Sequence, residues 1–287
     1  MSFSISKLYQ QVFGKGQLGF VIQVAGFALA FLLSILLTNF YDDKVYGNYV
    51  LVFSTVEILA VFSMMGYNQL FAIHIPQFFR ERDKVSELYQ KAKKATLRNS
   101  IIFGSLCILF TCFYPFKDSA IRLFVIGAGV LLPLIALTAL KTSLLYSLRV
   151  HIMPQVNERV LKLLVFIGVL LLLLIWGAKT EQLLLAFTAS SLFTFLMVTR
   201  LKNKHFQRVA PSTHFDFHKA KQSIVLLVSI NLIGLLFSKT DTFMVGYYLG
   251  AEFSGINNIY MKMASVMTLG MTGAMVASSP RISEWIS

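Results

Sequence analysis

Charged residues are scarce in this chain. Asp, Glu, Lys and Arg make up 14% of its 287 residues, whereas they make up about 25% of a typical soluble domain. Hydrophobic residues make up 56%. This balance argues against a soluble domain and indicates segments of about 20 apolar residues that cross a lipid bilayer.

Residues that carry metal, redox or nucleotide chemistry are also scarce. Cys107 and Cys112 lie in one apolar run, where we expect small apolar fillers that do not form a disulfide. No CxxC, HExxH or P-loop motif occurs. The spacing of His214 and His218 could hold a metal on one helix face, but interfacial polarity explains the pair better. We therefore expect no cofactor, no resident metal and no catalytic residue, and hence a protein that is not an enzyme.

Long apolar runs fill most of the chain and predict an all-α, polytopic membrane protein with about eight transmembrane helices. The first run is too long for the core of a signal peptide and lacks a small-residue cleavage site, so we expect it to remain as a span. The eight runs cover residues 17–38, 48–67, 99–116, 120–140, 160–176, 182–199, 223–249 and 251–279.

The distribution of basic residues predicts the orientation. With the N-terminus in the cytoplasm, most of the 26 Lys and Arg residues fall on the cytoplasmic side, including Arg159 and Lys162 beside the fourth loop. The outer side holds Lys44, Lys117, Arg122 and Lys179. This asymmetry predicts that both termini are cytoplasmic. It also accounts for the net charge of +13 without any nucleic-acid partner.

A weak internal repeat relates the start of the chain to its end. Residues 17–67 contain an apolar run, a short polar break and a second apolar run, and the same order returns after residue 220. In this register Gly26 aligns with Gly234, Gly47 with Gly255, and Gln23 with Asn231. Such repeats are typical of transporters, whose half-units rock about a central site.

The repeat suggests a domain division. We expect a six-helix lobe over 1–199, preceded by an interfacial helix at 3–13, then a cytoplasmic linker over 200–222. Residues 223–287 would form the first two helices of a second lobe that is incomplete at the C-terminus. Because polar or small residues follow one face of the first, second, seventh and eighth runs, we expect the last two runs to pack beside the first two.

Charged side chains inside the apolar runs are the best candidates for a site, because an ionised group at mid-bilayer costs roughly 2.5–3.5 kcal/mol. They are Glu57, Lys239, Asp241 and Lys262, and helical spacing adds Asn231 and Asn258 to the same faces. We expect these residues to line a water-filled cavity. The alternative is structural: Lys262 pairs with Asp241 or Glu57, while Lys239 and Asp241 lie near a helix end.

Several motifs resemble those of the bacterial polysaccharide (O-antigen and capsule) flippases. The runs are LLTNFYDDKVYGNYVLV (36–52), MMGYNQLFAIHIPQ (64–77), FSKTDTFMVGYYLGAEFSGINNIYMKMASVM (237–267) and SSPRISE (278–284). The family's aspartate, glycine, tyrosine and basic residue match Asp241, Gly255, Tyr260 and Lys262, with Pro280 and Arg281 at the inner end.

The resemblance implies a MATE-like alternating-access exporter with two six-helix lobes. It implies that polyprenyl-diphosphate-linked oligosaccharide moves to the outer leaflet of the inner membrane for surface polysaccharide biosynthesis. Lys239 and Lys262 could supply the cations that a diphosphate needs, and Glu57 or Asp241 could couple to H+ or Na+. Membrane lipids and polysaccharide polymerase or assembly proteins are the partners that the resemblance implies.

Two other functions stay open at this point. One is a MATE-type, cation-coupled antiporter of small molecules, which needs a more acidic cavity than Lys239 and Lys262 suggest. The other is a membrane partner that does not transport, because the family pattern has twelve spans and this chain accommodates eight.

Overall fold

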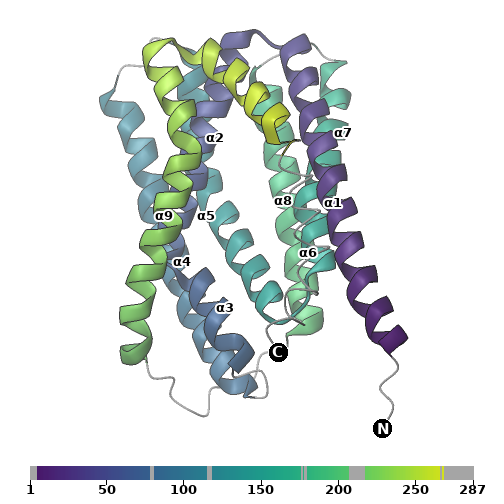
Figure 1. Ribbon diagram of the computed structural model, residues 1–287. Coiled ribbons are helices and arrows are strands. Elements are labelled where there is room, and N and C mark those ends of the chain that lie inside the picture. The colour runs from purple at the N-terminus through teal and green to yellow at the C-terminus, as the bar shows by residue number, and fades with distance from the viewer. Residues whose placement is uncertain are drawn as a thin grey trace.

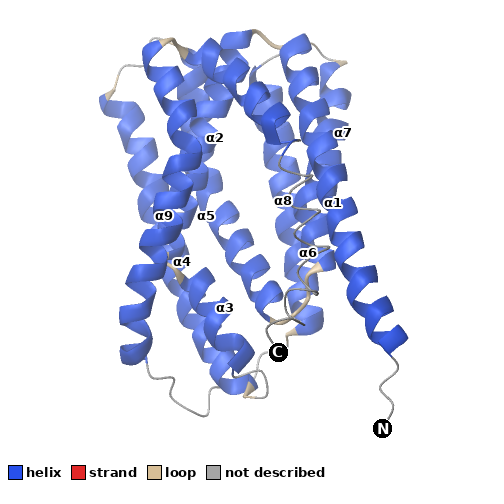
Figure 2. Ribbon diagram, viewed as in Figure 1, coloured by secondary structure: helices blue, strands red, loops and turns tan. Residues whose placement is uncertain are grey.

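The computed structural model describes residues 5–77, 81–114, 118–175, 177, 180–206, 217–265 and 267; side chains are described over the same ranges except 5–17, 77, 217–227, 230 and 231. Every regular element in these ranges is a helix (Figure 2). The elements are α1 (Ile5–Phe40), α2 (Asp43–Met64), α3 (Tyr67–Gln77), α4 (Arg82–Phe113), α5 (Ser119–Ser147), α6 (Ile152–Val156), the π-helical turn η1 (Asn157–Leu161), α7 (Lys162–Leu174), α8 (Thr180–His205) and α9 (Phe217–Tyr248). Residues 251–265 are also helical, and we call them helix 251–265.

The predicted all-α, multi-pass architecture is confirmed. Within the described residues, the segments that are long and apolar enough to cross a membrane are Leu18–Phe40, Asp43–Met64, Arg82–Phe113, Ser119–Ser147 and Thr180–His205. The other predicted spans correspond to the stretch from α6 to α7, to α9, and to helix 251–265. The end of the predicted eighth span lies outside the described residues, so a count of eight spans stays a prediction.

The long helices run alternately between the two ends of the bundle (Figure 1). One end carries the α1–α2 connection and is the end predicted to be outer; we call it the α1–α2 end. The opposite end carries α3 and is called the α3 end. Left-handed backbone occurs at several turns: Met65 and Gly66 (φ 45° and 77°) separate α2 from α3, and Gly250 (φ 103°) separates α9 from helix 251–265.

The domain boundaries stay predictions. Helix α1 is continuous from Ile5, so the segment predicted at 3–13 is not a separate helix, and its position at the membrane surface is still a prediction. The predicted linker over 200–222 contains the end of α8 and the beginning of α9. Residues 207–216 within it lie outside the described residues.

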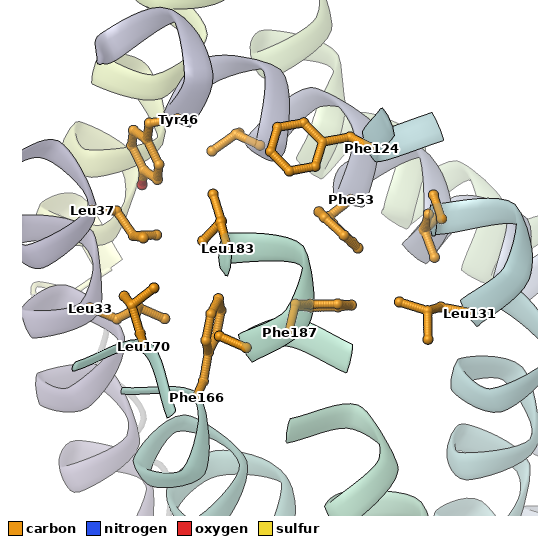
Figure 3. Packing of buried hydrophobic residues seen from close by; sticks show 14 of the residues in the cluster. Leu33, Leu37, Tyr46, Phe53, Phe124, Leu131, Phe166, Leu170, Leu183 and Phe187 are labelled. Carbon is orange, nitrogen blue, oxygen red and sulfur yellow. The ribbon is translucent and has the colours of Figure 1, made fainter. Parts of the chain in front are cut away.

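Aromatic side chains form the centre of the bundle. Phe53 of α2, Phe124 of α5, Phe166 of α7 and Phe187 of α8 are all buried and converge in Figure 3. The ring centroids of Phe53 and Phe187 are 4.0 Å apart. Since lipid tails are as apolar as these rings, close van der Waals packing rather than exclusion of water holds such helices together.

Small residues let two pairs of helices approach closely. Gly104 of α4 and Gly129 of α5 are so close that a Cβ on either would collide with the other's carbonyl oxygen. Gly47 of α2 likewise lies against the Ala251 carbonyl, and a Cβ on Gly255 would lie 3.3 Å from the Gly47 nitrogen. Gly47 and Gly255 occupy the same position in the two sequence repeats. Their contact confirms that the last predicted run packs beside the second.

Candidate functional site

A cavity of about 390 Å³ lies at the centre of the bundle and is called the central cavity. It is enclosed by parts of α1, α2, α5, the stretch from η1 to α7, α8, α9 and helix 251–265. Its charged lining residues are Glu57, Glu158, Arg159, Lys162, Lys239 and Lys262. Of the residues predicted from the sequence, Glu57, Lys239, Asn258 and Lys262 therefore share one cavity.

Lys239 and Glu57 form an ion pair across this cavity. The ammonium of Lys239 on α9 lies 2.7 Å from the Glu57 carboxylate on α2. The Lys239 side chain is 22% exposed and that of Glu57 is 58% exposed, so the pair lies on the open side of the cavity. Glu57 therefore pairs with Lys239 and not with Lys262, and whether its role is structural or functional stays a prediction.

Lys262 reaches from helix 251–265 to α1. Its ammonium donates to the Ser34 hydroxyl at 2.5 Å and to the Ala30 carbonyl at 3.4 Å. Among the described residues, no carboxylate lies within 4 Å of it. Two neutral acceptors do not balance the positive charge of the ammonium, which has three protons to donate. An anion entering the cavity would therefore meet a cation that no carboxylate of the described residues contacts directly.

A small hydrogen-bonding group surrounds this ammonium. The Tyr46 hydroxyl lies 3.3 Å from Ser34 Oγ and 3.2 Å from Asn258 Oδ1. Ser34 in turn donates to the Ala30 carbonyl at 3.0 Å. These contacts join α1, α2 and helix 251–265, and they fix where the Lys262 side chain can go.

Asp241 and Asn231 are placed differently from the other predicted residues. Asp241 is exposed and does not line the central cavity, because it lies two residues beyond Lys239 and therefore on the opposite side of α9. Gly234 and Ser238, which share the Asp241 face, are exposed as well. The side chain of Asn231 lies outside the described residues. The functional roles of Asp241 and Asn231 stay predictions.

Three charged residues in the cavity were not among the predicted site residues. Glu158, Arg159 and Lys162 come from the π-helical turn η1 and the first residue of α7. Sequence reasoning placed Arg159 and Lys162 beside a cytoplasmic loop, because they lie at the start of the apolar run over 160–176. Arg159 packs so tightly on α1 that a Cβ on Gly26 would lie 2.9 Å from the Arg159 Cβ.

The π-helical turn explains this placement. The Asn157 side chain donates to the Thr194 carbonyl of α8 at 3.2 Å and anchors the turn inside the bundle. Single π-helical turns inside α-helices are frequent at functional sites. The charged run ERVLK (158–162) at the start of an apolar segment could have indicated these cavity residues. Hydropathy alone, however, does not show whether a charged side chain lies inside the bundle or at its surface.

A second cavity, of about 620 Å³, opens toward the α3 end. It is lined mainly by α3 and α5, and Glu158 lines both this cavity and the central cavity. Thr142 and Tyr146 of α5 lie beside the Glu158 carboxylate, and Arg159 and Lys162 lie close enough to act on it. A single carboxylate with two basic neighbours therefore lies between the two cavities.

The balance of charge in the central cavity indicates what it can bind. Arg159, Lys162, Lys239 and Lys262 are opposed by Glu57 and Glu158, so basic residues outnumber carboxylates. No group of His, Cys, Asp and Glu in the described part of the chain has metal-binding geometry. The arrangement suits an anion with several oxygen acceptors better than a cation.

The fold and this cavity define a class: a multi-pass helical membrane protein with a positively charged internal cavity. The model of the polysaccharide biosynthesis protein family matches residues 18–285, and the chain belongs to that family. The resemblance seen in the sequence is thereby confirmed, and the chain is a membrane protein of polysaccharide synthesis. No curated protein and no solved structure matches it.

Proposed function

We propose that this protein flips polyprenyl-diphosphate-linked oligosaccharide across the bacterial inner membrane by alternating access, for surface polysaccharide biosynthesis. Family membership supports a role in polysaccharide synthesis. The observation that carries the transport proposal is the convergence of four basic side chains on one internal cavity. Basic side chains within the membrane-spanning part of a chain are costly unless they serve an anionic ligand or an ion pathway.

The diphosphate is the part of the substrate that these cations would bind. Lys262 presents an ammonium without a carboxylate partner among the described residues, and Arg159 and Lys162 line the same cavity. Asn258 and the Tyr46 hydroxyl lie beside Lys262 and can hydrogen-bond to sugar hydroxyls. The polyprenyl tail would stay in the bilayer while the head group occupies the cavity.

The two cavities support an alternating-access cycle. The central cavity would receive the head group in one state, and the cavity at the α3 end would open in the other. Glu158 lies between them. A rearrangement of its contacts with Arg159 and Lys162 would therefore change which of the two cavities is open. For ion coupling we propose Glu57, because H+ or Na+ bound there would release Lys239 for the substrate. Asp241 stays the second candidate for this role.

Substitution of Lys262 tests the proposal in cells whose surface polysaccharide depends on this protein. Lys262→Ala should abolish surface polysaccharide at normal protein level, because the cavity loses this cation. Lys262→Arg should restore export at least in part, since the charge is kept. Unchanged polysaccharide in Lys262→Ala would contradict the proposal. If Lys262→Ala lowers the protein level, Lys239→Gln on the exposed side of the cavity provides the second variant.

The proposed orientation has both termini in the cytoplasm, and it predicts which positions a membrane-impermeant thiol reagent can reach. In a background with Cys107 and Cys112 replaced by alanine, Asp43→Cys at the α1–α2 end should react in intact cells. Lys94→Cys should react only after permeabilisation. The reverse order would contradict the orientation.

A cation-coupled drug antiporter is less consistent with this cavity, because basic side chains outnumber carboxylates there. A cationic drug would be repelled by Lys262, which has no carboxylate within 4 Å among the described residues. A membrane partner that does not transport is the third candidate. It would give no transfer of lipid-linked oligosaccharide between leaflets when the purified protein is placed in vesicles.

A further inference from the structure

Three lysines converge in a separate pocket at the α3 end. The pocket has a volume of about 470 Å³ and is lined by Tyr89, Lys93, Lys141, Thr199, Lys202, Asn203 and Phe206. Lys93 belongs to α4, Lys141 to α5 and Lys202 to α8. We call these three residues the lysine cluster. None of them lines the central cavity.

Lys141 is the buried centre of the cluster. Only 5% of the residue is exposed. Its ammonium donates to Thr199 Oγ1 at 2.7 Å and lies 3.5 Å above the ring of Phe195. A hydroxyl and an aromatic face hold the ammonium in place without cancelling its charge. This cation is therefore positioned in advance at the floor of the pocket.

The other two lysines add positive charge around it. Lys202 is 8% exposed and lies 3.1 Å from Asn203 Oδ1 and 5.3 Å from the centre of the Tyr89 ring. Lys93 and Lys202 both lie close enough to Lys141 to repel its charge. The pocket lining contains no Asp or Glu. Such repulsion is offset when an anion binds between the lysines.

The surroundings of the pocket indicate which anion. Along α4, one and two turns from Lys93, lie the exposed side chains of Leu97 and Ile101, and along α8 the exposed Leu196 lies near Thr199. An apolar surface thus begins where the cluster ends. A ligand with a phosphate head group and acyl chains matches both parts, whereas free phosphate would use only the lysines.

We propose that the lysine cluster binds the phosphate head group of an anionic membrane phospholipid, with the acyl chains along the exposed faces of α4 and α8. The site is independent of the substrate cavity. It would anchor α4, α5 and α8 to the leaflet at the α3 end, which is the end predicted to face the cytoplasm. Basic residues near an anionic bilayer surface contribute about 1 kcal/mol each.

Native mass spectrometry of the full chain in detergent, titrated with defined lipids, measures this binding. We expect phosphatidylglycerol to bind the wild-type protein more tightly than phosphatidylcholine, whose head group has no net charge. Lys93→Gln should weaken phosphatidylglycerol binding about fivefold, the equivalent of one lysine contact. Lys93→Arg should keep the wild-type affinity.

Lys94→Gln is the matched control, because Lys94 is the next residue on α4, is exposed and is absent from the pocket lining. It removes the same charge and should leave the affinity unchanged. Lys93 is half-exposed, so the protein should still fold with glutamine at this position. Lys202→Gln is a second variant that should also weaken phosphatidylglycerol binding. Equal effects of Lys93→Gln and Lys94→Gln, or equal binding of the two lipids, would overturn the proposal. Displacement of phosphatidylglycerol by equimolar inorganic pyrophosphate would assign the site to a soluble phosphate instead and would also overturn it.

Discussion

The central cavity and the lysine cluster both contain basic side chains from different helices, but they differ in the carboxylates that balance the positive charge. In the central cavity Lys239 pairs with Glu57, and Glu158 lies beside Arg159 and Lys162. In the lysine cluster the pocket lining holds hydroxyl, amide and aromatic groups but no carboxylate. With the lysine cluster at the bilayer surface as proposed, lipid head groups would supply its counter-charge, whereas Lys239 of the central cavity finds a carboxylate within the bundle.

The largest effect is expected from a substitution that disrupts the central cavity and leaves the lysine cluster intact. Gly47→Val should displace helix 251–265 from α2, because the new side chain overlaps the Ala251 carbonyl. Overpacking of this kind costs about 1–3 kcal/mol or more. Surface polysaccharide should be lost, while phosphatidylglycerol binding at the lysine cluster persists. Gly168→Ala is the control, since a Cβ there meets no atom within 4 Å.

Crosslinking checks the structural part of this prediction. In a background with Cys107 and Cys112 replaced by alanine, Ser34→Cys with Lys262→Cys should form a crosslink between α1 and helix 251–265. Adding Gly47→Val should reduce its yield strongly. An unchanged yield, or a loss of lipid binding together with export, would mean that the two regions are not separable in this way.

A smaller effect is expected at the Lys239–Glu57 pair. Glu57 is 58% exposed, so solvent screens the pair, and its coupling free energy should be at most about 1 kcal/mol. A double-mutant cycle with Glu57→Gln and Lys239→Gln, measured by thermal unfolding in detergent, gives that number. Export should fall in both single variants. A coupling of several kcal/mol would indicate a purely structural pair.

The last expected effect concerns stability alone, at Asp118 of the α1–α2 end. Its carboxylate accepts from the Ala120 nitrogen at 3.0 Å and pairs with Lys44 at 3.2 Å, and these contacts hold its pKa below the ordinary value of 3.8. A depressed pKa stabilises the folded state above pH 3.8, and this contribution disappears as pH falls through the folded-state pKa. Asp118→Ala should therefore cost about 1 kcal/mol near neutral pH.

Thermal unfolding of both proteins as a function of pH checks the sign. The difference in Tm between wild type and Asp118→Ala should be constant between pH 6 and 5 and should shrink as the pH approaches 3. A difference that grows on acidification would show that the carboxylate is not stabilised as its contacts indicate.

The positions of most spans and the contact between the two repeats could be predicted from the sequence. Runs of apolar residues mark helices directly, and the aligned glycines Gly47 and Gly255 proved to touch. The repeat also placed Lys262 and Asn258 beside α1 and α2, where the structure finds them. These predictions succeeded because apolar runs and the order of elements in a repeat are properties of the sequence itself, whatever the packing of the helices.

The remaining part of the site could not be predicted, because direction and depth are tertiary properties. Helical periodicity grouped Asp241 with Asn231 on one face of α9, but the packing of α9 on α2 turned Lys239 inward instead. Arg159 immediately precedes the apolar run, so hydropathy placed it at the edge of that run, and Glu158 was not singled out. The Asn157 anchor and the π-helical turn bring them into the cavity.

The central claim is that the central cavity moves a lipid-linked diphosphate, and flipping by purified protein in vesicles tests it most directly. The probe is a fluorescent polyprenyl-diphosphate oligosaccharide whose outer-leaflet fraction is quenched by dithionite. The account predicts transfer between leaflets well above that of protein-free vesicles, a fall of about tenfold or more in Lys262→Ala, and wild-type transfer in Lys94→Gln. Transfer equal to protein-free vesicles, or equal in wild type and Lys262→Ala, would contradict it.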